Sequence, residues 1–201
     1  MASVEEASDY PLLHAQAVIL LWTGLEALVR DFLATWLENV EASRTIEPLR
    51  RTKVRLGELE SLSGREKYLF MIDSLEETLG SRRSAGIERF EVLFRALGMS
   101  SPIPAEVTQP LFELANVRHV LVHRRGIVDR KFAELLPQLS YRPEDELKID
   151  HAIYHRFYDA VDLYVHELIQ RTRLHFGGER SGHRRDCRFF DEDDRVKQGS
   201  D

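Results

Sequence analysis

The sequence predicts an all-α protein, and three observations support this fold class. Apolar residues recur every three or four positions in several segments, which is the spacing on the buried face of an amphipathic helix. No segment alternates apolar and polar residues with a period of two, so we expect no sheet. Hydrophobic residues form 43% and charged residues 31% of the 201 positions, a balance typical of a globular chain with one core. We therefore expect one domain over residues 1–176, built as a bundle of five to six helices.

Capping residues, prolines and glycines set the ends of the expected helices. Asp9 and Pro11 indicate the start of the first helix, Gly80 ends a later one, and Asp129 caps a short helix that Pro137 stops. The bundle helices that we expect are residues 11–43, 68–79, 84–97, 110–123 and 149–175, with two short helical stretches at 56–62 and 129–136.

Residues 177–201 are expected to form a disordered polar tail. They contain six cations and seven anions, few apolar residues and no helical periodicity. This segment holds Cys187, the single cysteine of the chain, which leaves no disulfide framework and favours a reducing compartment. The start of the chain is acidic, unlike a signal peptide, and the apolar run 17–22 is far shorter than the ~20 residues that span a bilayer. We therefore expect a cytoplasmic protein that does not enter a membrane.

The distribution of charge is more informative than the net charge of −6. Two windows, residues 44–55 and 116–131, each hold five cations and one anion. The first is most simply a solvated turn. The second surrounds two histidines on the helix expected over 110–123, so an acidic protein could bind a phosphate there.

That helix carries an unusual arginine on its expected core face. On a helical wheel, one face gathers five apolar residues and includes Arg118. The apolar members of this face are Leu111, Leu114, Ala115, Leu121 and Val122. Asn116, His119 and His123 form a polar stripe on the flank. Arg118 and His123 point ~140° apart, so one straight helix would not aim both into one small pocket, whereas two copies about a two-fold axis could.

The run from Leu111 to Asp129 resembles the signature helix of the HEPN superfamily. That signature is an arginine, a polar residue, three further residues and a histidine, on a late helix of an all-α bundle; here these are Arg118, His119 and His123. The resemblance implies a HEPN-like bundle that dimerises through this helix. It also implies a metal-independent endoribonuclease of toxin–antitoxin, abortive-infection or CRISPR-associated systems. Arg125 stands where one toxin subgroup has a tyrosine that a partner enzyme modifies, so we do not expect that regulation here.

The resemblance implies a role for each site residue. Arg118 and His123 would be catalytic, His119 and Asn116 would position them, and Arg124 and Arg125 would contact RNA. Histidine can move protons near neutral pH, and the arginine fork suits the charge that develops on a phosphate. No metal and no cofactor is expected. The expected partners are RNA, a second copy of the chain and an antitoxin or defence-system protein.

Simpler interpretations remain open at this point. Arg118 could be the buried ion-pair partner of a carboxylate such as Glu26. The pairs His119/His123 and His151/His155 could ligate a metal, although no third-ligand pattern accompanies them. The whole bundle could be a non-catalytic dimeric interaction or sensor module.

Overall fold

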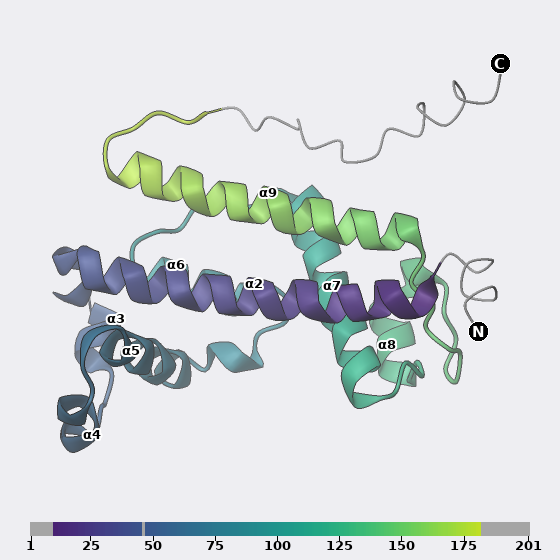
Figure 1. Cartoon of the computed structure of the whole chain (residues 1–201), viewed down its shortest axis with the longest axis horizontal. Helices are drawn as coiled ribbons and strands as arrows, with labels where there is room; N and C mark the ends of the chain where they lie inside the picture. The colour runs from purple at the N-terminus through teal and green to yellow at the C-terminus, as the bar shows by residue number, and fades with distance from the viewer. Residues whose placement is uncertain (1–9, 46, 182–201) are drawn as a thin grey trace, which may run out of the picture.

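The computed structural model of the chain describes residues 10–45 and 47–181. These residues form eight α-helices and no strand, which confirms the all-α class (Figure 1). The helices are α2 (Pro11–Asn39), α3 (Glu47–Arg51), α4 (Leu56–Ser61), α5 (Gly64–Leu79), α6 (Glu88–Ala96), α7 (Ala105–His123), α8 (Arg130–Leu135) and α9 (His151–His175). Asp9, the expected first cap, lies outside the described residues.

Helix α2 organises the bundle, because it packs against α5, α7 and α9. Figure 1 shows α2 and α9 running side by side along the long axis, with α7 crossing them. The buried side chains of α2 recur at helical spacing and form one stripe that faces the core; they include Val18, Trp22, Leu25, Val29, Leu33 and Leu37. The long helix expected over 11–43 ends earlier, at Asn39, and is followed by a 3₁₀ turn, Glu41–Thr45.

One helix in the described part of the chain, α2, is long and apolar enough to cross a bilayer by length and composition alone. Only 22% of its most apolar 18-residue window is buried against the rest of the bundle. The exposed face of α2 retains large apolar side chains, among them Leu13 and Leu20.

Three helix starts differ from the expectation, and α3 lies in a window that was expected to be a turn. Helix α5 begins at Gly64, four residues before the expected start at 68. Helix α6 begins at Glu88 instead of Ser84, because Gly86 has φ +57° and packs against α7 in a turn. Helix α7 begins at Ala105 and runs through Pro110, which was expected to open it. The preceding Pro104 carbonyl accepts hydrogen bonds from Val107 and Thr108 and so starts the helix one turn earlier.

The core face of α7 is also rotated from the expected one. Leu111 and Leu114 are fully buried as expected, but Val117 and Val120 are buried with them, whereas Val122 is 43% exposed. The reason is that α7 is covered from two sides, by α2 and by α9, so its buried arc is set by both neighbours. Gly80, Asp129 and the end of α9 at His175 are placed as predicted.

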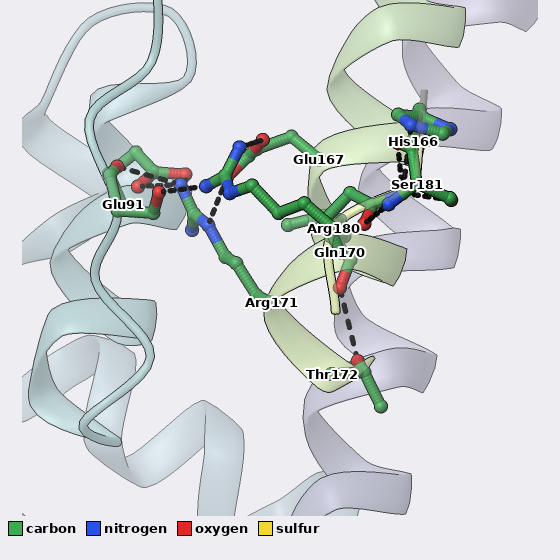
Figure 2. A network of polar contacts seen from close by, with 10 residues as sticks. Glu91, His166, Glu167, Gln170, Arg171, Thr172, Arg180 and Ser181 are labelled. Atoms are coloured by element: carbon green, nitrogen blue, oxygen red, sulfur yellow. Dashed lines mark hydrogen bonds and ion pairs between the residues drawn. The ribbon is translucent and has the colours of Figure 1, made fainter. Parts of the chain in front are cut away.

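A buried polar network joins α9 to α6 (Figure 2). The Arg171 guanidinium, 3% exposed, donates through two nitrogens to the Glu91 carboxylate at 3.1 and 2.9 Å, and the Tyr164 hydroxyl donates to Glu91 at 2.6 Å. Burial, and next the charge of Glu91, raises the pKa of Tyr164 well above its ordinary value, so this hydroxyl stays protonated and donates. The network fixes the register between the two helices.

The described part of the expected tail, residues 177–181, is held against α9. The Gly178 amide donates to the Arg173 carbonyl at 2.8 Å, and the Ser181 amide donates to the Gln170 side chain at 3.0 Å. The Arg180 guanidinium reaches Glu167 at 3.1 Å (Figure 2). These residues thus continue along α9 past residue 176; the remainder of the expected tail, 182–201, lies outside the described residues.

Candidate functional site

The end of α7 forms one wall of a cavity of about 360 Å³. The opposite walls come from α2, from the turn 84–86 before α6, and from α8 with its cap Asp129. Gly86 allows this approach, because a Cβ there would lie 3.1 Å from the Cα of Phe112 on α7. The lining side chains that carry polar groups are Trp22, Glu26, Ser84, Arg89, Asn116, Arg118, His119, Arg124, Asp129 and Lys131.

Arg118 lies half-buried in the wall of this cavity. Its Nε is fully buried and has no hydrogen-bond partner, and no ion pair involves its side chain within the described residues. The ion pair with Glu26 considered above is not formed, because Glu26 pairs with Arg89 of α6 at 2.5 Å. Arg118 therefore brings an uncompensated charge to the cavity.

The cavity has a surplus of positive charge. Arg89, Arg118, Arg124 and Lys131 line it, against the carboxylates of Glu26 and Asp129. Each carboxylate is already paired with an arginine. Glu26 pairs with Arg89 of α6, and Asp129 pairs with Arg124 at a nitrogen–oxygen distance of 3.3 Å. Arg118 and Lys131 are left, in the described part of the chain, without a carboxylate. Such a set attracts an anion, and a phosphate group matches both its size and its charge.

His119 lines the cavity, and His123 stands beside it on the outer side. Their ring centroids are 4.8 Å apart, one helical turn along α7, while His123 is exposed and does not line the cavity. Although most of His119 is exposed, the partial burial of its ring lowers its pKa below the ordinary 6.5, and the positive charges of His123 and Arg124 lower it further. The lowered pKa favours the neutral form of the His119 ring, which can accept a proton.

The exit of α7 separates the two arginines that follow His123. Arg124 turns toward the cavity, whereas Arg125 adopts φ +55° and lines a separate hollow with Leu12, Gln16 and Lys148. The Gly126 amide closes the helix by donating to the Val120 carbonyl at 3.1 Å. Ile127 then forms one isolated antiparallel bridge with Glu146, and the Asp129 carboxylate caps α8 by accepting from the Phe132 amide at 2.8 Å.

The structure therefore brings together four of the six predicted site residues. Asn116, Arg118, His119 and Arg124 share the cavity, and the Asn116 amide donates to the Phe112 carbonyl at 2.8 Å. His123 and Arg125 lie outside it.

Sequence reasoning missed Arg89 and Lys131 as members of the site. Lys131 belongs to the cationic window 116–131, which was a usable signal. Arg89 lies on another helix, and no local pattern connects it to Arg118.

No group of three or more His, Cys, Asp or Glu side chains in the described residues has a geometry that could hold a metal ion. The ring centroids of His151 and His155 are 4.1 Å apart, and the ring centroid of His14 on α2 lies 5.8 Å from that of His151. These rings form an aromatic cluster with Tyr154 at the start of α9.

Comparisons of the chain with protein-family models, with curated proteins and with solved structures find no match. A functional assignment therefore depends on the cavity residues and on the resemblance of the segment 111–129.

Proposed function

We propose that this protein is a metal-independent endoribonuclease of the HEPN type, acting in the cytoplasm as a toxin or phage-defence effector. The observation that supports it best is the unpaired Arg118 guanidinium in a positively charged cavity, on the same helix end as two histidines whose ring centroids are 4.8 Å apart. This combination offers a phosphate-binding group and proton-transfer groups on one helix end. Cleavage of RNA by its own 2′-hydroxyl requires both.

In the proposed reaction, the planar fork of Arg118 binds the non-bridging oxygens of the scissile phosphate and stabilises their developing charge. The 2′-oxygen attacks the phosphorus and loses its proton, and the bond to the leaving 5′-oxygen breaks as that oxygen gains a proton. His123 acts as general acid or base for one of these protons, and solvent water exchanges the other. His119 and Asn116 position the reacting groups, and Arg124 and Lys131 hold flanking phosphates. The products carry a 2′,3′-cyclic phosphate and a 5′-hydroxyl.

The proposal includes a two-fold dimer, because His123 does not line the cavity of its own chain. A second copy packed against the end of α7 supplies its His123 to the Arg118 cavity of the first, and the reverse. An antitoxin or defence-system partner would act by covering this joint site.

The decisive experiment compares RNA cleavage by wild-type protein with that of His123→Ala and Arg118→Ala. Each variant should lose about a hundredfold or more in rate, because each removes a group that acts in the transition state. Arg118→Lys should also be impaired, since an ammonium keeps the charge but not the two-pronged contact. Cleavage should persist in EDTA and fail on RNA with hydrogen in place of the target 2′-hydroxyl.

Matched controls are available on α8 and α9. His155→Ala removes an exposed histidine that also has a histidine one turn away, and Arg130→Ala removes an exposed arginine outside the cavity. Both should cleave as wild type does. If wild-type protein cuts no RNA, or if His123→Ala cuts as fast as His155→Ala, the proposal fails and the non-catalytic interaction module takes its place.

A further inference from the structure

The last described residues run back along α9 toward its start. Gly178 bonds to Arg173, and three residues later Ser181 bonds to Gln170, so the chain moves antiparallel to the helix. Figure 1 shows this turn, in yellow, at the end of α9, and Figure 2 shows Ser181 beside Gln170. The polypeptide therefore leaves the described region on a defined face of α9.

A groove continues on that same face. Its volume is about 490 Å³, and it is lined by Glu106 and Pro110 of α7 and by Ala152, Arg156, Asp159 and Leu163 of α9, among others. At about 100° per residue, Arg156, Asp159 and Leu163 fall within about 40° of Gln170 around the helix axis. The chain at Ser181 is thus aimed along this groove.

The chain after Ser181 is long enough to reach the far end of the groove. Eight extended residues, from Ser181 to Phe189, span at most ~26–29 Å. The 18 helical positions from Gln170 back to Ala152 span ~27 Å at 1.5 Å each. Phe189 and Phe190 can therefore reach the far end of the groove, where Pro110 and Ala152 offer apolar surface.

The charges of the groove and of the chain are complementary. Glu106 and Asp159 are exposed and make no hydrogen bond or ion pair with any described residue, whereas the groove's Arg156 is engaged with the buried Glu113. Between Ser181 and Phe189 the sequence holds Arg184, Arg185 and Arg188 against one acid, Asp186. The groove thus offers two carboxylates without partners among the described residues, and the segment after Ser181 has a surplus of arginines.

We propose that residues 182–190 dock in this α7–α9 groove of their own chain. Arg184, Arg185 and Arg188 lie along Glu106 and Asp159, and Phe189 and Phe190 cover Pro110 and Ala152. This inference is independent of the ribonuclease proposal, because the groove lies at the opposite end of α7 from the Arg118 cavity.

Cys187 provides the test, since it is the only cysteine in the chain and lies inside the docked segment. A second thiol is introduced into the groove wall by His155→Cys and, as control, on α5 by Lys67→Cys; both positions are exposed. The full-length variants are treated with a short bis-maleimide at sub-micromolar concentration. We expect rapid cross-linking within one chain for His155→Cys and at least ~10-fold slower cross-linking for Lys67→Cys.

Charge reversal then tests the recognition itself. Glu106→Arg with Asp159→Arg should slow the His155→Cys cross-link about tenfold, and adding Arg184→Asp with Arg185→Asp should restore it. Equal rates at the two introduced thiols would overturn the proposal. A product that joins two chains would also overturn it, because the groove would then be occupied by the segment of a second copy.

Discussion

Arg118 carries a charge at every physiological pH, and its partial burial is costly unless a partner compensates. The fold gives the nearby carboxylate of Glu26 to Arg89 and leaves the Nε of Arg118 without a hydrogen bond. The Nε–H of Arg118 is therefore a buried donor without an acceptor at the wall of the cavity. A bound phosphate would supply the missing acceptors, which is why Arg118 is the residue on which the proposed chemistry depends most.

The protonation of His119 gives a prediction at the same scale. Since burial is the larger cause of its lowered pKa and the charge of Arg124 a smaller one, Arg124→Gln should raise the pKa of His119 without restoring it to 6.5. In the wild type the ring should become neutral, as pH rises, at a lower pH than a free histidine does. Titration by NMR of the His119 ring measures both effects.

The matched control for this titration is Arg130→Gln. Arg130 pairs with Glu134 on the exposed side of α8 and does not line the cavity. Its removal should leave the His119 titration unchanged. An unshifted His119 in Arg124→Gln would show that Arg124 does not approach the ring in solution.

At the scale of elements, the site depends on how α7 meets the turn before α6. The turn at Gly86 replaces the first residues of the expected helix and brings Ser84 and Arg89 to the cavity. A helix that began at Ser84 could not do this, because the left-handed conformation of Gly86 redirects the chain. The close contact between Gly86 and Phe112 therefore positions the turn 84–86 as one wall of the cavity.

Gly86→Ala should accordingly destabilise the protein by about 1–3 kcal/mol, since alanine is strained at positive φ and its Cβ would press on the α7 backbone. Gly24→Ala is the control, because this glycine lies inside α2 with open space around it. The free energy of unfolding of this variant should rise by about 0.5–1 kcal/mol. Denaturant unfolding of both variants gives the comparison. A Gly86→Ala variant as stable as wild type would mean that the turn is not tightly packed on α7.

At the scale of the whole molecule, the end of α7 presents two different faces. One face closes the cavity with Arg118, His119 and Asn116, and the other exposes His123 and Val122 to solvent. A single chain therefore does not place the predicted catalytic pair in one cavity. In the proposed dimer, each cavity is completed by the exposed face of the other copy.

Mixing two inactive variants tests this arrangement. If Arg118 and His123 of one site come from different chains, an exchanged mixture of Arg118→Ala and His123→Ala should recover about a quarter of wild-type cleavage, because half the dimers are mixed and each of these has one intact site. Light scattering should give about twice the chain mass of 23.3 kDa. Absence of recovery in a mixture that has exchanged chains would place both residues of a site on one chain.

The sequence alone determined the fold class and most helix ends, because helical periodicity, caps and breakers act within a few residues of one another. Gly80, Asp129 and the long α9 follow from such local signals. The divergence of Arg118 and His123 also follows, since the angle between two residues on one helix is fixed by its pitch.

Only the tertiary structure decided which residues share the cavity. Arg89, Glu26 and Lys131 come from three other segments, and no local pattern joins them to Arg118. The same holds for the pairing of Glu26 with Arg89 and for the buried arc of α7, where Val117 and Val120 replace the expected Val122. The physical reason is that burial and ion pairing are set by neighbours distant in sequence, and periodicity records which face of a helix is apolar but not which helix covers it.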